Sequence, residues 1–372
     1  MTAAVSTKSF GRALLALAGA GLLAAGCVTR TEPRFTSFQG WQNFESFQHL
    51  TNGNSVTLIS PRLKAAGAWR ELIVSWNASV SPENHLEVEA RGFRAGRATK
   101  FYTLGLWSED AARHPRESVK GQRDDDGTVL TDTLVMRQPM DEAQFRITLT
   151  DDGGKNFPRL KFAGASFLGG SGPVEKIPTH PAARGKIIDV PQRAQTGHPG
   201  ANGWCSPTCV SMLLAHWAHV LQRPDLDVSV PAVAAGVHDR NWPGTGNWVF
   251  NTAFAGKFAG MRAYVTRFGD VREIEEWVAA GIPVAASVSF DLLNGKPSDE
   301  GNGHLIVVVG FTAEGDVVVN DPWPNPKKEN SVRKIFPRKN FITAWERSRR
   351  AVYLIYPEPR TVPENRWKHW ME

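Results

Sequence analysis

The pattern of apolar residues changes at a Gly/Pro-rich stretch in the middle of the chain, and this change constrains the fold more than any other feature. Before it, residues 35–168 contain short segments in which apolar and polar positions alternate, which is the period of a β-strand. After it, apolar residues recur at helical spacing, as in Val210, Leu213 and Trp217. A chain of 372 residues is long enough for two cores, so the pattern predicts an all-β region followed by a region that contains helices.

The first region is expected to be an antiparallel β-sandwich, because about seven short strands at this spacing are typical of that fold. Turn-forming residues separate the strands, and two turns, 124–127 and 151–154, are rich in aspartate. These acidic turns could bind calcium, but neither has the full spacing of a calcium loop, which favours ordinary hydrogen-bonded turns. The expected strands are Val56–Ser60, Glu71–Val80, His85–Ala90, Lys100–Leu106, Leu130–Arg137, Phe145–Thr150 and Leu160–Phe167.

The second region is expected to be an α+β domain over residues 187–357, because its helices come first and its strands follow. Residues 169–186 have no periodic apolar pattern and are predicted to be a linker. Residues 358–372 are predicted to be a C-terminal tail. The expected strands of this domain are Pro283–Phe290, His304–Phe311, Asp316–Asn320 and Ala351–Tyr356.

The N-terminal segment is predicted to be an export signal. Lys8 and Arg12 precede an apolar run that is too short to span a membrane comfortably and that ends at small residues before Cys27. Residues 22–27, Leu-Leu-Ala-Ala-Gly-Cys, resemble the lipobox of bacterial lipoproteins, which implies that residues 1–26 are a lipoprotein signal peptide and that Cys27 carries a lipid. The alternative is an ordinary secretory signal.

The lipobox resemblance implies an exported protein that is anchored to a bacterial membrane through lipid and faces the periplasm or the cell surface. Val28 follows the cysteine instead of an aspartate resembling an inner-membrane retention signal, so the outer membrane is the favoured destination. The formal net charge of +6 is spread along the chain, and Lys8 and Arg12 leave with the signal. This mild, scattered basicity argues against a nucleic-acid partner.

Cys205 is the best candidate for a nucleophile. It lies directly before an amphipathic helical pattern, with Pro207 at an early helical position where a missing N–H costs nothing. At a helix N-terminus, free backbone N–H groups and the helix dipole favour the thiolate, which is the reactive form. Cys209 lies one turn further on and is interpreted as a core residue, a redox pair with Cys205 being the alternative.

His304 is the candidate base because it begins an apolar run, Leu305–Gly310, that is typical of a buried strand. A turn at Gly315 leads to a second such run, which ends at Asp321. If the two runs pair as a hairpin, Asp321 becomes a cross-strand neighbour of His304 and can orient its imidazole. Nucleophile, base and orienting carboxylate would then meet without any metal or other cofactor.

These motifs resemble those of the bacteriocin-processing (double-glycine-leader) cysteine peptidases and their free-standing relatives, which have a papain-like fold. The likeness includes Asp189-Val190-Pro191 with Gln195, Cys205-Ser206-Pro207, Gly303-His304 and Asn320-Asp321-Pro322, in the family's chain order. The resemblance implies that Cys205 is the nucleophile, His304 the general base and acid, Asp321 the orienting residue and Gln195 an oxyanion donor, with Gln192 as the substitute for Gln195.

The favoured function is therefore hydrolysis of a peptide or related amide bond through a thioester acyl-enzyme. The partner is a peptide or protein substrate, and cell-wall material is a further candidate. Two alternatives stay open: an acyltransferase of the same fold, and a surface-tethered binding module whose papain-like domain is catalytically idle. Four tryptophans near the motifs are candidates for a substrate groove: Trp204, Trp242, Trp248 and Trp323.

Overall fold

The computed structural model describes residues 34–171, 178–297, 302–324 and 332–371, and residues Pro33–Glu372 form one compact unit. The predicted signal peptide, residues 1–26, and the predicted lipid attachment site, Cys27, lie outside the described residues. Within the part of the chain that is described, no helix is long and apolar enough to cross a membrane.

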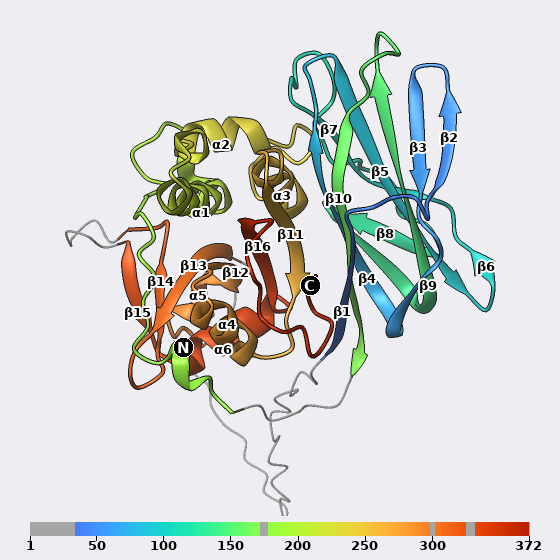
Figure 1. Ribbon diagram of the computed structural model, residues 1–372. Helices are drawn as coiled ribbons and strands as arrows, with labels where there is room; N and C mark the ends of the chain where they lie inside the picture. The colour runs from blue at the N-terminus through green and yellow to red at the C-terminus, as the bar shows by residue number, and fades with distance from the viewer. Residues whose placement is uncertain (1–33, 172–177, 298–301, 325–331, 372) are drawn as a thin grey trace, which may run out of the picture. The chain divides into compact units, whose positions relative to one another are not determined.

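The first region is all β, as predicted, and its strands form one curled antiparallel sheet (Figure 1). The main strand order is β1-β10-β4-β9-β3-β2, while β5, β7 and β8 extend the sheet through pairing with β9 and β5. Alternation of apolar residues gives the longer strands a buried face, so Leu86, Val88 and Ala90 of β5 are all in the core. The strands are β1 (Arg34–Trp41), β2 (Gln48–Asn52), β3 (Ser55–Ile59), β4 (Leu63–Ser79), β5 (Asn84–Arg94), β6 (Arg97–Ala98), β7 (Tyr102–Ser108), β8 (Gly127–Leu130), β9 (Thr133–Asp151) and β10 (Arg159–Ser171).

Strand β9 differs from the sequence-based expectation. The predicted strands Leu130–Arg137 and Phe145–Thr150 belong mostly to this one strand of 19 residues. Between them, Pro139 and two acidic residues interrupt the apolar alternation and suggest a break. The pairing of β9 with β4 is irregular around Trp69, so the missing N–H of Pro139 costs little. The backbone can therefore stay extended through this segment.

The second region has the α+β composition predicted for it. Its six-stranded antiparallel sheet has the order β11-β16-β12-β13-β14-β15, and α1 and α3 lie on one side of it while α4 and α6 lie on the other (Figure 1). Its helices are α1 (Cys205–Leu221), α2 (Val230–Val237), α3 (Trp248–Gly256), α4 (Val271–Ala279), α5 (Phe290–Leu293) and α6 (Arg338–Arg347). Its strands are β11 (Met261–Arg267), β12 (Val284–Ser289), β13 (Gly303–Phe311), β14 (Val317–Asn320), β15 (Arg333–Phe336) and β16 (Ala351–Pro357).

The two regions share a buried interface between β4 and the pair α3 and β11. The side chain of Asn77 bridges to the backbone of Ala263, donating to its carbonyl at 2.7 Å and accepting from its N–H at 3.0 Å. Nearby, Arg267 pairs with Glu71 at 3.1 Å, and both side chains are almost completely buried. Phe250 packs against Trp76 at 6.2 Å between ring centroids. The buried apolar residues of both regions thereby join in one continuous cluster.

Candidate active site

Cys205 is the first residue of α1, as the sequence predicts. Its thiol is free and partly exposed, and the backbone N–H groups of Ser206 and Leu305 donate hydrogen bonds to the sulfur. No side chain caps the helix N-terminus. The exposed N–H groups and the dipole of a 17-residue helix therefore act on the sulfur directly.

His304 lies near the start of β13, where its side chain is buried beside Cys205. Its Nε2 lies 2.7 Å from Oδ1 of Asp321, and the ring also hydrogen-bonds the thiol of Cys205. Since Nε2 faces Asp321, Nδ1 is the nitrogen left for the sulfur. The edge-to-face contact with Phe290, at 5.2 Å between centroids, fixes the plane of the imidazole further.

Asp321 follows β14 and reaches His304 diagonally, not from the directly opposite position. Asn320 pairs with Val307, which places Asp321 across from the residue two positions after His304. Diagonal neighbours on one sheet face remain within reach of long or planar side chains. The predicted contact therefore forms although the two residues are not directly opposite each other. The carboxylate is completely buried and also accepts the backbone N–H of Trp323 at 2.9 Å.

Lys334 is part of this hydrogen-bond network, although no pattern in the sequence marks it. Its Nζ donates to Oδ2 of Asp321 and to the backbone carbonyl of Trp323, both at 2.7 Å. It comes from β15, which pairs with β14 and was not among the predicted strands. Asp321 therefore uses one carboxylate oxygen for His304 and the other for a lysine.

The electrostatics favour an ion pair between Cys205 and His304. Burial by itself raises the pKa of the thiol, but hydrogen bonding to His304 and the charge of its ring outweigh burial and lower it. Burial likewise disfavours the imidazolium, yet the hydrogen bonds to Asp321 and Cys205 raise the pKa of His304 to about 9. The pKa of Asp321 is lowered against its burial by His304 and Lys334. These shifts favour the thiolate of Cys205 and the imidazolium of His304 over the neutral pair.

Gln195 lies in the wall of the cleft that Cys205 and His304 line, and it is almost fully buried. Its Nε2 donates to the carbonyls of Ala201 and Asn202, both at 3.0 Å, and among the described atoms its Oε1 has no hydrogen-bond partner. The amide therefore holds the turn that precedes Cys205. Gln192 is not among the cleft residues, and its Oε1 accepts the backbone N–H of Arg333 at 3.2 Å.

Cys205 and His304 line a cleft of about 850 Å³, whereas the buried Asp321 is not in its lining. Three of the four predicted groove tryptophans line it, and Trp242 and Trp323 are 45% and 39% exposed. Trp204 is not in its lining and instead stacks on His198 at 5.9 Å between centroids. The cleft presents two free indole surfaces to a substrate.

The β8–β9 turn of the first region forms part of the wall of this cleft, which the sequence did not suggest. The residues that it contributes are Leu130, Thr131, Asp132 and Thr133. Thr131 has φ of +59°, a conformation that costs a β-branched residue on the order of 1–3 kcal/mol. Asp132 is buried, and burial raises its pKa to about 6 although the N–H of Trp248 donates to it. Backbone strain and a buried carboxylate in one turn are typical of functional sites.

The remaining candidates have structural roles in the described residues. Cys209 is completely buried in α1, and burial raises its pKa well above its ordinary value. The carboxylate of Asp124 accepts the backbone N–H groups of Asp126 and Gly127, both at 3.0 Å. That of Asp151 accepts the N–H groups of residues 155 and 156. The two acidic turns thus use these carboxylates in local hydrogen bonds.

Both regions of the chain match models of known protein families. Residues 187–353 match the family described as Peptidase C39 like, and residues 40–167 match the Peptidase C39 N-terminal domain. Both regions are therefore similar to parts of C39 peptidases. A crystal structure described as a C39-like peptidase from Bacillus anthracis has 20% identity and a TM-score of 0.35, and the match covers 45% of this chain and 96% of that chain. A comparison with curated proteins gave no match. The C39-like assignment confirms the papain-like fold predicted for the second region.

Proposed function

We propose that this C39-like protein is an active cysteine peptidase that cleaves peptide bonds through a thioester. The observation that carries the proposal is the continuous hydrogen-bonded path from Cys205 through His304 to Asp321 at the bottom of an open cleft. A catalytically idle relative has no need to hold a thiol with a lowered pKa next to a buried imidazolium.

The thiolate of Cys205 attacks the carbonyl carbon of the substrate, and a carbon–sulfur bond forms. His304 donates its proton to the leaving nitrogen as the carbon–nitrogen bond breaks, which releases the amine and leaves a thioester. The neutral His304 then takes a proton from water, whose oxygen attacks the thioester. The acid is released, and the thiolate and the imidazolium are restored.

The negative charge on the substrate oxygen needs donors near Cys205. The backbone N–H of Cys205 is suited to this purpose because it stands at the start of α1, whereas Ser206 already donates to the sulfur and Pro207 has no N–H. Gln195 supports the same site by holding Ala201 and Asn202, or by turning its amide toward the oxygen when substrate binds. A peptide or protein fits a cleft of this size and its exposed indoles, and cell-wall peptide is included in this class.

The place of action that we propose is the outside of a bacterial membrane, with a lipid on Cys27 as the anchor. The support is the sequence of residues 22–27 and the preceding basic and apolar segments. A tethered peptidase meets substrates at the cell surface or in the periplasm.

Reactivity of the two thiols tests the proposal without knowledge of the substrate. At pH 6, iodoacetamide should modify Cys205 rapidly and Cys209 hardly at all, as measured by mass spectrometry of digests. The His304→Ala variant should lose the rapid reaction. A peptide library should then yield a substrate whose turnover is abolished in Cys205→Ala and retained in Cys209→Ala. Equal, slow alkylation of both thiols would refute an activated nucleophile.

A further inference from the structure

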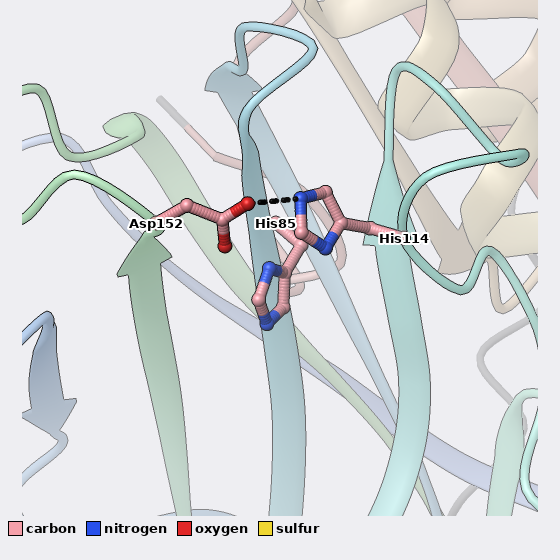
Figure 2. Close-up of side chains that lie close together, drawn as sticks. All are labelled: His85, His114 and Asp152. Atoms are coloured by element: carbon pink, nitrogen blue, oxygen red, sulfur yellow. Dashed lines mark ion pairs between the residues drawn. The ribbon is translucent and has the colours of Figure 1, made fainter.

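A cluster of two histidines and one aspartate lies in the first region, separate from the catalytic trio. His85 is at the start of β5, His114 is in the loop after β7, and Asp152 follows β9 (Figure 2). The strands β7, β5 and β9 are neighbours in the sheet, with His85 paired to Ser108 of β7 and to Thr150 of β9. The ends of three adjacent strands thus bring these side chains together.

The three side chains are arranged so that their polar atoms face one another. One ligand atom from each lies within 4.8 Å of the other two. The two imidazoles stack with centroids 4.5 Å apart, and Nε2 of His114 lies 3.3 Å from Oδ2 of Asp152, the ion pair drawn in Figure 2. Two histidines and a carboxylate are among the commonest ligand sets for Zn²⁺.

One of these nitrogens has unmet hydrogen-bonding capacity. Nδ1 of His85 is buried and has no hydrogen-bond partner among the described residues, while the buried Nε2 of His114 has its ion-pair contact with Asp152. Leaving such atoms without a partner is costly, and each instance in a folded protein calls for an explanation.

We propose that His85, His114 and Asp152 bind one divalent transition-metal ion of the Zn²⁺ class. Ligand atoms around tetrahedral zinc lie about 3.4 Å apart, so the side chains must close by roughly 1 Å on binding. Asp152 can make this movement, since its side chain is 42% exposed and lies outside the strands. The same exposure leaves room for water as the fourth ligand.

Arg113 is the main competitor for the carboxylate. Its guanidinium lies 3.5 Å from Oδ2 of Asp152 and 3.3 Å from Glu83. Arg113 is 46% exposed, so solvent screens these contacts and they are weak. An ion on Asp152 leaves Arg113 paired with Glu83. The metal would join the ends of β5, β7 and β9, and its role is structural.

The experiment uses the full chain with Cys205→Ala, because a thiolate beside a histidine could itself bind the metal. Titration with Co²⁺, followed by visible absorption, and with Zn²⁺, followed by calorimetry, should give one ion per chain. His114→Ala should weaken binding by about 100-fold or more, and Asp152→Asn should weaken it clearly. His49→Ala removes an exposed histidine of β2 in the same region and should bind like the parent.

Stability and selectivity complete the test. Zn²⁺ should raise the Tm of the parent and of His49→Ala, and it should leave the Tm of a folded His114→Ala variant unchanged. Mg²⁺ should not compete, because it prefers oxygen ligands. The proposal is overturned if the parent binds no ion, if His114→Ala binds as tightly as the parent, or if Mg²⁺ competes equally.

Discussion

The backbone N–H of Trp248 donates a 2.6 Å hydrogen bond to the carboxylate of Asp132. Trp248 is the first residue of α3 in the C39-like region, and Asp132 lies in the β8–β9 turn of the N-terminal domain. A carboxylate from one region thus contacts the N-terminus of a helix in the other, where the helix dipole favours negative charge. This contact lies in the wall of the catalytic cleft.

Replacement of Asp132 by Asn should change how stability depends on pH. Because burial raises the pKa of Asp132 to about 6, the folded protein binds this proton more tightly than the unfolded chain does. Its contribution to stability therefore declines as pH rises from about 4 to about 6. Asn can still accept the N–H of Trp248 and carries no charge. The free energy of unfolding of Asp132→Asn should therefore exceed that of the wild type by roughly 2–3 kcal/mol at pH 7 and equal it at pH 4.

Urea titrations from pH 4 to pH 7.5 measure this difference, with Asp125→Asn as the control. Asp125 is exposed in the same stretch of chain, so its replacement should leave the pH dependence as it is. A constant difference between Asp132→Asn and the wild type at every pH would contradict the assignment of a buried, charged carboxylate.

The rate of hydrolysis should fall at high pH when His304 loses its proton. The pKa of about 9 on His304 sets the alkaline limit of kcat/KM for the free enzyme. Lys334→Met removes a cation from Asp321, so the negative charge of that carboxylate acts more strongly on His304 and stabilises the imidazolium. The alkaline limit should therefore move to higher pH in Lys334→Met.

Lys339→Met is the matched control for this prediction, because Lys339 is exposed in α6. Its pH profile should coincide with that of the wild type. A downward shift of the alkaline limit in Lys334→Met would mean that Lys334 acts mainly by holding the carbonyl of Trp323 and the loop around it.

Gln195→Ala should lower kcat by roughly 10²–10³-fold, which is the usual effect of losing one oxyanion donor. Rotation of the amide toward a substrate oxygen breaks no hydrogen bond of the unpartnered Oε1, but Nε2 must exchange at least one of its bonds to Ala201 and Asn202 for one to the substrate. Gln192→Ala serves as the comparison, since that side chain only accepts the N–H of Arg333. Kinetics and Tm should be measured for both variants. A loss of Tm with a raised KM in Gln195→Ala would instead indicate that Gln195 only anchors Ala201 and Asn202.

Cys27→Ala should release the protein from membranes. The anchor predicted from the N-terminal sequence is a covalent lipid on Cys27. No charged residue interrupts the apolar run that precedes this cysteine. Cell fractionation with an antibody against the C39-like region measures the distribution. If the variant stays in the membrane fraction, then the lipoprotein interpretation of residues 22–27 is wrong.

The sequence predicted those parts of the site that depend on local pattern. The position of Cys205 follows from the start of a helical apolar pattern, and that of His304 follows from the start of a buried strand. The contact of His304 with Asp321 was predicted from hairpin pairing, but it depends on the bulge between Val308 and Gly310, which moves Asp321 from opposite Val307 to opposite Ile306 and so onto the sheet face of His304. A bulge has no clear signal in a run of valines.

The parts that the sequence missed depend on contacts between distant segments. Lys334 reaches Asp321 because β15 pairs with β14, and Asp132 reaches the cleft because the first region packs on α3. Neither residue has a neighbour in the sequence that marks it. β15 was also missed because it is a short edge strand of four residues with two basic side chains. Three-dimensional assembly, not local propensity, places these two residues.

Strand β9 connects the two sites of interest in the first region. Asp132 immediately precedes it and Asp152 immediately follows it, and a strand of 19 residues spans at most about 60 Å. Since side chains alternate along a strand, deletion of one residue within β9 would turn one end over relative to the other. A shortened β9 could keep the cleft wall or the histidine cluster in place, but not both. One-residue insertions and deletions should therefore be excluded from the length of β9.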